Sequence, residues 1–447
     1  MRRFLADLVS RLRASSFARN ASWSIGLSLI ERLIGVVQTI IISRTVGMTE
    51  YGVYGLLMST IGLVSGAAGF QMGLPAILYI SRYRHTDKCK VAGVISVIQR
   101  FGWLACAGLV LLSMFYADEL ARNLFDNPKY KVIVLLGACI AAVSVLSGLQ
   151  DGIAQGFEIF KTLAKLKSTT AALSLLVIVP AAELFGLEGV LAALLAGLLA
   201  KYIFLGRMVR RMRCKEAIPR RGTGIRFRSL VASIAFPSVA VSILAGFAGW
   251  LGMFRLSRQA TGFDGVAIVN TGLQWCGPVL LVAASLGSVA IPAFSRLISA
   301  GDEGRSRQLR RLLIRVNLVL SLGAALLLIL FSKLVLSLYG PGFSIGRLPF
   351  GLIVLSAVPM VLANVYSQEL LGAARLWRIL VLYLPHITVL VLCYWLLIPR
   401  FGALGYGISS LIGSVVLLVT LFRASSRGSV ESRTTSHRVA VFRGDTE

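Results

Sequence analysis

Acidic residues are scarce in this chain of 447 residues, which has 19 Asp and Glu against 46 Lys and Arg. Only 15% of the residues are charged and 56% are hydrophobic, which excludes an ordinary soluble globular domain. The mean hydropathy of +0.80 is instead typical of a membrane protein. No polar stretch is long enough to form a large soluble domain between the apolar ones.

The chain also lacks the residue groups that hold metals or form disulfide frameworks. Its six cysteines include no Cys-x-x-Cys pair, and its three histidines, His85, His386 and His437, are far apart. We therefore expect no metal site and no cofactor. A Walker A sequence is missing as well, which excludes ATP hydrolysis as a driving force. With no catalytic constellation left, the sequence does not indicate an enzyme.

The chain does have about twelve long apolar stretches, separated by short polar segments. A helix that crosses about 30 Å of hydrocarbon needs about 20 apolar residues. The stretches are 20–43, 53–80, 91–116, 132–150, 167–185, 187–206, 229–253, 266–294, 312–335, 349–367, 377–398 and 403–422. We therefore expect an all-α integral membrane protein with about twelve transmembrane helices, located in the inner (plasma) membrane of a bacterium.

Basic residues alternate in number from one connecting segment to the next. The N-terminal segment, every second loop and the C-terminal segment hold 34 of them, whereas the intervening loops hold nine. Because Lys and Arg are retained on the cytoplasmic side of a membrane, this alternation predicts that both termini are cytoplasmic. Topology thus accounts for the net charge of +27, and we expect no nucleic-acid partner.

The longest basic loop divides the chain into two halves of six expected spans each. We predict a cytoplasmic basic arm, an N-terminal six-helix bundle, a basic cytoplasmic linker, a C-terminal six-helix bundle and a disordered cytoplasmic tail. These parts cover residues 1–19, 20–206, 207–228, 229–422 and 423–447. The arm has no apolar region or cleavage site of its own, so it does not read as a signal peptide.

The two halves contain one pair of similar segments. The second stretch ends in GLPAILYISR and the eighth in GSVAIPAFSR, which share the spacing Gly-x7-Ser-Arg from Gly73 and from Gly287. The offset of 214 residues fits a duplication of six spans, although two helices rich in small residues could also be similar by chance. Two co-oriented six-span repeats with a substrate site between them are typical of transporters.

Charged residues inside the apolar stretches mark the candidate functional residues. Glu31 and Arg32 fall in the middle of the first stretch and Arg100 near the middle of the third. A charge at this depth costs about 3 kcal/mol, so each should face a partner or a wet cavity. Guanidinium groups suit phosphates, so we predict that Arg32 and Arg100 bind an anionic substrate. Alternatively, Glu31 pairs with one of these arginines and locks helices together.

Several uncharged or near-surface residues form a second tier. Asn270 and Gln274 lie one helical turn apart in the eighth stretch, where they could bind sugar or form hydrogen bonds between helices. Lys201 and Arg315 lie close enough to the cytoplasmic surface to extend their charges into water. His386 is expected to be a hydrogen-bonded contact between helices.

The junction of the first two stretches carries a family resemblance. It reads Arg44-x2-Gly47-x2-Glu50-Tyr51-Gly52-x-Tyr54, followed by an apolar stretch that ends in Gly-x7-Ser-Arg. This pattern resembles the polysaccharide biosynthesis, or O-antigen flippase-like, transporters of the multidrug/oligosaccharidyl-lipid/polysaccharide (MOP) exporter superfamily. The resemblance implies a protein that flips a polyprenyl-pyrophosphate-linked oligosaccharide from the cytoplasmic to the outer leaflet. Its partners would be this lipid-linked oligosaccharide and membrane lipids, with a polysaccharide polymerase and export machinery as further candidates.

The chain departs from two relatives of that family. Lipid II flippases usually have fourteen spans, and the sequence shows no thirteenth or fourteenth. Multidrug members carry acidic residues in the N-terminal cavity, whereas Glu31 is the only acid in the middle of a span here. A cationic cavity favours anionic cargo over cationic drugs. It also makes Glu31 the candidate ion-coupling residue.

Two other functions stay open. An ion-coupled multidrug exporter would share the expected architecture and would confer resistance to cationic dyes. A polysaccharide polymerase or assembly scaffold would need a large external loop, and the longest expected ones, residues 117–131 and 336–348, are short.

Overall fold

The computed structural model describes residues 16–69, 72–219, 236–299, 301–373 and 375–431, and all regular elements within them are helices. The helices of the first half, here the N-half, are α2 (Ser16–Val46), α3 (Met48–Ala68), α4 (Gly73–Tyr83), α5 (Lys88–Phe125), η1 (Pro128–Tyr130), α6 (Lys131–Gly156) and α7 (Phe160–Lys215). Those of the C-half are α9 (Phe236–Ser257), α10 (Gly262–Ser299), α11 (Glu303–Leu330), α12 (Ser332–Tyr339), η3 (Pro341–Gly346), α13 (Arg347–Gly372), α14 (Leu376–Phe401) and α15 (Ala403–Glu431).

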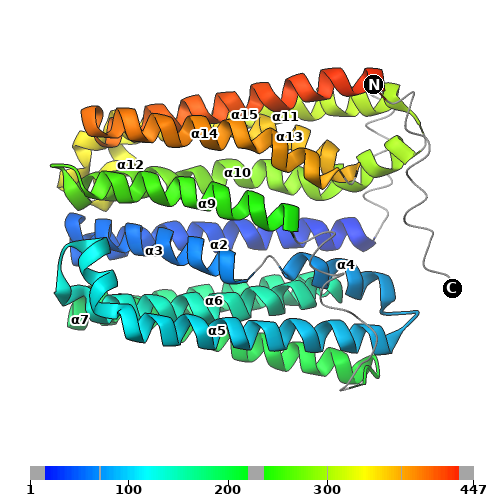
Figure 1. Ribbon diagram of the computed structural model, residues 1–447, viewed down its shortest axis with the longest axis horizontal. Coiled ribbons are helices and arrows are strands. Elements are labelled where there is room, and N and C mark those ends of the chain that lie inside the picture. The colour runs from blue at the N-terminus through cyan, green and yellow to red at the C-terminus, as the bar shows by residue number, and fades with distance from the viewer. Residues whose placement is uncertain (1–15, 70–71, 220–235, 300, 374, 432–447) are drawn as a thin grey trace.

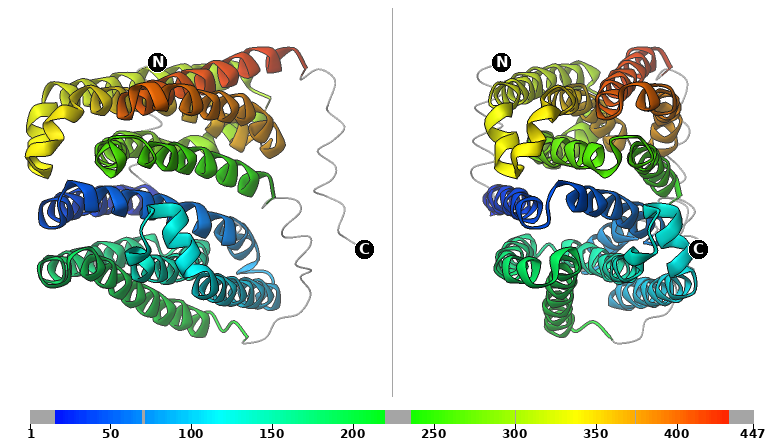
Figure 2. Two further views of the ribbon diagram at one scale, coloured as in Figure 1. Left: turned by 60° about the vertical axis from the view of Figure 1, so that its left-hand side comes forward. Right: turned by 90° about the vertical axis from the view of Figure 1, so that its left-hand side faces the viewer.

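The long helices lie side by side in one bundle, with the N-half on one side and the C-half on the other (Figures 1 and 2). In the described part of the chain, nine helices are long and apolar enough to cross a membrane. One of the nine, α7, contains two of the expected spans, and two further expected spans fall within α2 and α10. The molecule is therefore an all-α, multi-pass membrane protein, while the count of twelve spans and the orientation remain predictions.

Several helix boundaries differ from the bounds of the expected stretches. The second stretch is not one helix, because the chain leaves the helix after α3 and resumes it at α4, with Gly69 and Gly73 beside the break. The first nine residues of the expected linker, 207–215, continue α7, and the first nine of the expected tail, 423–431, continue α15. Arg, Lys and Met are good helix formers, so charge alone does not end a helix. The remainder of the arm, linker and tail lies outside the described residues.

The last long helices of the two halves match in length and in the place of a kink. Helices α6 and α13 have 26 residues each. Gly186 kinks α7 with φ 57° and ψ −137°, and Gly402 separates α14 from α15 with φ 54° and ψ −129°. These two glycines lie 216 residues apart, so α7 corresponds to α14 and α15 together. The agreement supports an internal duplication that includes α6 and α7 of the N-half and α13, α14 and α15 of the C-half.

The halves differ in where they interrupt a helix. The N-half breaks between α3 and α4, whereas its counterpart α10 runs unbroken over 38 residues. Conversely, α5 is continuous over 38 residues, and its counterpart is divided into α11 and α12.

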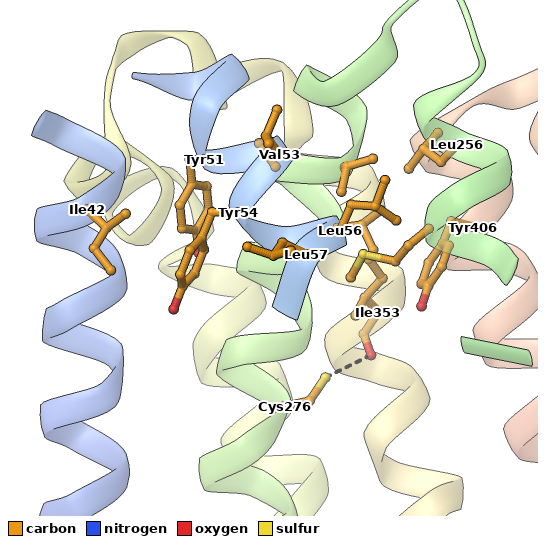
Figure 3. Packing of buried hydrophobic residues seen from close by; sticks show 14 of the residues in the cluster. Ile42, Tyr51, Val53, Tyr54, Leu56, Leu57, Leu256, Cys276, Ile353 and Tyr406 are labelled. Atoms are coloured by element: carbon orange, nitrogen blue, oxygen red, sulfur yellow. Dashed lines mark hydrogen bonds between the residues drawn. The ribbon is translucent and has the colours of Figure 1, made fainter. Parts of the chain in front are cut away.

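Among the side chains that the structure describes, the hydrophobic core is shared by the halves towards one end. We call this the outer end, where α2 meets α3, and the opposite end, where α2 begins, the inner end; both names follow the predicted orientation. The largest buried cluster joins side chains of both halves near the outer end, including Tyr51, Leu56, Leu256 and Ile353 (Figure 3). Towards the inner end, separate clusters form within the N-half, around Ile80, and within the C-half.

Candidate functional site between the halves

The resemblance motif forms part of the outer contact between the halves. The Arg44 guanidinium donates from Nε to the carbonyl of Leu338, 2.6 Å away, and from Nη2 to that of Ser337, 2.9 Å away. These carbonyls belong to the last turn of α12, where backbone acceptors lack helical partners. The motif's arginine therefore joins the two halves.

Gly52 of the motif and Gly55, which directly follows the motif, allow α3 to approach α10 closely. A Cβ added at Gly52 would lie 1.9 Å from the carbonyl oxygen of Phe263, and one at Gly55 would lie 3.0 Å from Cβ of Asn270. Nearby, the Thr49 hydroxyl donates to Asp264 across the same contact over 2.7 Å. Any side chain at position 52 would push the halves apart.

Farther inward, Arg32 and Gln274 lie across the contact between α2 and α10. A Cβ added at Gly277 would be 3.0 Å from Nη1 of Arg32, and one at Gly35 would be 3.5 Å from Nε2 of Gln274. Asn270, one turn outward on α10, packs against Gly55 as described above. Three of the predicted substrate-binding residues, Arg32, Asn270 and Gln274, thus lie along the interface between the halves.

Two charged residues in the middle of α2 have no ion-pair partner among the residues that the structure describes. Glu31 is half-buried and Arg32 is exposed, and neither forms an ion pair with any residue that the structure describes. The alternative in which Glu31 locks helices together by pairing with Arg32 or Arg100 is therefore wrong for this arrangement. The Arg32 guanidinium therefore lies at the interface without a described counter-ion.

Arg100 is not brought to Arg32. It lies on the exposed face of α5 with Leu104 and Phe115, which are 75% and 83% exposed. Helix α5 packs mainly on α6 and α4, whereas α2 packs on α7, α10 and α3. Arg100 corresponds in the repeat to Arg315, which is exposed on α11. The expectation that Arg32 and Arg100 share one site is therefore corrected, because the two arginines lie on different packing faces.

Two further polar contacts, one between α9 and α3 and one between α2 and α7, were not predicted from the sequence. Trp250 on α9 donates from its indole nitrogen to the Thr60 hydroxyl, 3.0 Å away, which links the halves at mid-depth. Gln38 donates to the Ser174 hydroxyl over 2.7 Å and to the Ala171 carbonyl over 3.2 Å, which fixes α2 against α7. In the sequence, the signals for these contacts were the amide of Gln38 and the indole of Trp250, which lie within apolar stretches.

Lys201 does not extend into water as expected. Its ammonium lies 3.0 Å from Oδ2 of Asp151, and the Lys167 ammonium lies 3.2 Å from the same oxygen. Asp151 was missed because it follows the last residue of an expected span and so counted as part of a loop. His386 pairs through Nδ1 with the Gly413 carbonyl at 2.7 Å, which confirms it as a contact between helices.

Within the described residues, no group of His, Cys, Asp and Glu side chains could hold a metal ion. The arrangement is that of two helical bundles with polar residues along their contact. Several solved structures share this fold. The chain matches an inward-facing multidrug resistance MATE family transporter of the MOP superfamily with a TM-score of 0.72 and 15% identity, over 93% of this chain and 100% of the other.

Two further structures show how general the fold is. A mutant form of the Vibrio cholerae MATE transporter VcmN matches with a TM-score of 0.70 and 16% identity, over 93% of this chain and 97% of that one. An outward-facing MATE family transporter matches with a TM-score of 0.68 and 14% identity, over 95% of this chain and 99% of the other. The protein therefore has the fold of the MATE transporters of the MOP superfamily.

Sequence comparison defines the family within that fold. The model of the polysaccharide biosynthesis protein family matches residues 17–298, more than half of the chain, and the protein belongs to this family. It is also 22% identical to the EPS I polysaccharide export inner membrane protein EpsE of Ralstonia nicotianae. That match covers 234 residues, which are 52% of this chain and 52% of EpsE, so it spans about half of the length of this relative.

Proposed function

We propose that the protein flips a polyprenyl-pyrophosphate-linked oligosaccharide, the repeat unit of a polysaccharide, from the cytoplasmic to the outer leaflet by alternating access. Membership in the polysaccharide biosynthesis family, the fold of a transporter and the similarity to EpsE support this cargo. The protein would act in the bacterial inner membrane, beside a polysaccharide polymerase and export machinery, and as a transporter rather than an enzyme.

The observation that carries the proposal is the Arg32 guanidinium at the contact between the halves, which has no ion-pair partner among the described residues. A cation in this position is costly unless an anion neutralises it. The pyrophosphate of the cargo offers paired oxygens that suit the paired donors of a guanidinium. Gln274 and Asn270, on the same side of α10, supply amide groups for sugar hydroxyls.

The location of the core supports alternating access. The halves share buried side chains at the outer end, whereas each has its own cluster towards the inner end. This arrangement is closed at the outer end, so a head group would enter from the cytoplasm. Transport then requires the outer contacts of Arg44 and Gly52 to open while the inner ends come together.

Glu31 is the proposed coupling residue. It is half-buried, it neighbours Arg32 in the sequence, and it forms no ion pair with a described residue. A carboxylate in that setting can take up a proton or Na⁺ in one state and release it in the other. Glu31→Gln is expected to abolish any dependence of flipping on an ion gradient.

A deletion strain tests the function directly. Loss of the gene is expected to stop polymer export and to accumulate lipid-linked repeat units in the inner leaflet, measured by extraction and by accessibility to an added glycosidase. Complementation with Arg32→Ala should fail, Arg32→Lys should restore export partly, and Arg315→Ala, a matched exposed arginine outside the contact, should restore it fully. Full export by Arg32→Ala would refute the role of the cationic interface.

An ion-coupled multidrug exporter is the second candidate, favoured by the match to MATE structures over nearly the whole chain. It predicts that overexpression raises resistance to cationic dyes and leaves polymer export unchanged. Sensitivity tests on the same deletion and overexpression strains decide between the two functions.

A further inference from the structure

Five residues form a polar cluster inside the N-half, away from the contact with the C-half. At its centre, the ammonium groups of Lys167 and Lys201 share Oδ2 of Asp151, at 3.2 and 3.0 Å. The three side chains are 24%, 18% and 14% exposed, so they lie largely inside the bundle but remain within reach of solvent. Two cations with one anion leave a net positive charge.

The cluster also contains acceptor atoms that the described part of the protein leaves unsatisfied. Oδ1 of Asp151, Oε1 of Gln150 and Oγ of Ser147 are buried and have no hydrogen-bond partner there. The three residues lie at positions i, i+3 and i+4 of α6, on one face of the helix. Buried polar atoms normally find a partner, so unsatisfied ones need an explanation.

The C-half shows that this fold does not require charge at these positions. An offset of 216 residues, set by Gly186 and Gly402, relates the cluster to Ala363, Tyr366, Ser367, Tyr383 and Leu417. There Asp151 and Lys167 are replaced by Ser367 and Tyr383, whose hydroxyls lie 3.4 Å apart. Ala363, Tyr366 and Leu417 pack in a hydrophobic cluster, so neutral side chains hold the same helices together.

Helix geometry places the cluster at the depth of Arg32. Helices α2 and the first part of α7 both run from the inner end, and Gln38 ties them at Ala171 and Ser174. Arg32 lies six residues before Gln38, or about 9 Å along the axis. Lys167 lies four and seven residues before the two tie points, or about 6 to 10 Å.

We propose that Lys167 and Lys201 form a second diphosphate-binding site, with Asp151 as a built-in counter-ion that the ligand displaces. The proposal rests on the proposed function, because the diphosphate is that of the lipid-linked cargo. Ammonium groups are point charges that bind phosphate oxygens without a fixed geometry, so they can pass from one anion to another. In the empty site, Asp151 holds both lysines in place; Ser147 and Gln150 would receive the hydrogen bonds of hydroxyls or water that accompany the ligand.

Binding of inorganic pyrophosphate to the purified full-length protein tests the proposal, by calorimetry in detergent. Lys167→Gln and Lys201→Gln are each expected to weaken binding by about tenfold. Asp151→Asn is expected to strengthen it, because the competing carboxylate is gone. Glu369→Gln, which disrupts the Arg310–Glu369 ion pair of the C-half, is the matched control and should leave the affinity unchanged.

The sign of the Asp151→Asn effect separates a ligand site from a structural network. If the cluster is purely structural, Asp151→Asn does not strengthen binding: all three single variants either bind pyrophosphate more weakly or keep the affinity of the wild type. Either result would overturn the proposal. The triple variant Asp151→Ser, Lys167→Tyr, Lys201→Leu installs the residues of the C-half; it should fold, as judged by thermal unfolding, and lose pyrophosphate binding. If single variants unfold, the triple variant still decides the question.

A second arm distinguishes cargo from membrane lipid. Anionic lipid also presents phosphate, so thermal unfolding is compared in nanodiscs of phosphatidylcholine with and without phosphatidylglycerol. Stabilisation by phosphatidylglycerol that depends on Lys167, without any response to pyrophosphate, would replace the diphosphate site by a lipid site. Failure of the deletion strain to lose export would refute the proposed function and leave pyrophosphate binding intact, so the two ideas fail separately.

Discussion

Helices α6 and α7 of the N-half and helices α13, α14 and α15 of the C-half have the same lengths and kinks, but the side chains between them differ in kind. The N-half has Asp151 between two lysines, with one carboxylate oxygen unsatisfied in the described structure. The C-half places its ion pair elsewhere: Nη1 of Arg310 lies 3.1 and 3.0 Å from the two oxygens of Glu369. The cluster of the N-half therefore has a net positive charge and an unsatisfied acceptor, whereas the Arg310–Glu369 pair of the C-half has no net charge.

This difference indicates how the two halves of a duplicated fold can take different roles. At the matching positions of the C-half, the Ser367 and Tyr383 hydroxyls lie 3.4 Å apart and Ala363, Tyr366 and Leu417 pack in a hydrophobic cluster, so this contact carries no charge. The N-half keeps charge at the matching depth, together with Arg32 at the interface, and bears the cost of keeping it there. Specific binding of an anion would thus belong to one half, while both halves move.

The strongest way to break the comparison is to place a carboxylate in the C-half. Ser367 is 7% exposed and its neighbour Leu417 is 1% exposed, so Ser367→Asp buries a charge without a lysine. We expect a loss of about 3 kcal/mol in stability, measured by thermal unfolding in detergent. Adding Leu417→Lys should recover part of it, because the new pair reproduces Asp151 and Lys201. An unchanged midpoint in Ser367→Asp would show that the C-half tolerates charge as well as the N-half does.

A smaller effect is expected from a matched pair of glycines. Gly52→Ala puts a Cβ 1.9 Å from the backbone oxygen of Phe263 in the other half, whereas Gly265→Ala puts one 2.9 Å from the Thr261 hydroxyl within its own half. A backbone carbonyl cannot rotate away, so Gly52→Ala should cost about 1 to 3 kcal/mol and impair export. Gly265→Ala should be milder, because a hydroxyl can turn. Equal export by the two variants would mean that the outer contact is not tight.

The position of a residue along its helix could be predicted from the sequence, but the face of the helix on which it lies could not. The expected spans ending at 185 and beginning at 187 coincide with the kink at Gly186. Arg32 and Arg100 were both placed near mid-span, but a hydropathy pattern does not tell which face a neighbouring helix will cover. Packing of α2 on α10 brings Arg32 to the interface, and packing of α5 on α6 turns Arg100 outward.

The polar cluster of the N-half was hidden for a related reason. Asp151 follows an apolar stretch, and Lys167 begins another, so each looked like a loop residue by composition. Helices α6 and α7 extend further than their apolar cores, which brings these ends inside the bundle. Their pairing joins residues 16 and 50 positions apart, and no local pattern encodes such contacts.

Substitution of the two kink glycines should have similar effects on stability in the two halves, unlike the substitutions discussed above. Gly186 and Gly402 combine positive φ values of 57° and 54° with negative ψ values, a conformation that costs other residues about 1 to 3 kcal/mol. An added Cβ at Gly186 meets no atom within 4 Å, so the cost there is that of the backbone alone. Gly186→Ala and Gly402→Ala should therefore lower the unfolding midpoint by similar amounts. A large difference between them would weaken the case for matching halves.

The smallest effect is expected at two matching helix caps. Asp87 accepts a hydrogen bond from the backbone amide of Lys90 at the start of α5, and Asp302 does the same with Arg305 at the start of α11. Asp87→Ala and Asp302→Ala should each lower the midpoint slightly at pH 7, because an alanine cannot cap a helix. The pKa of Asp87 lies below its ordinary value of 3.8, chiefly because the backbone amide of Lys90 donates a hydrogen bond to its carboxylate. Its contribution is therefore present above that value and is lost as the pH falls through the lowered pKa. The midpoints of wild type and Asp87→Ala should converge as the pH falls through this lowered pKa; a difference that does not shrink with falling pH would mean that the Asp87 carboxylate is not what stabilises this end of α5.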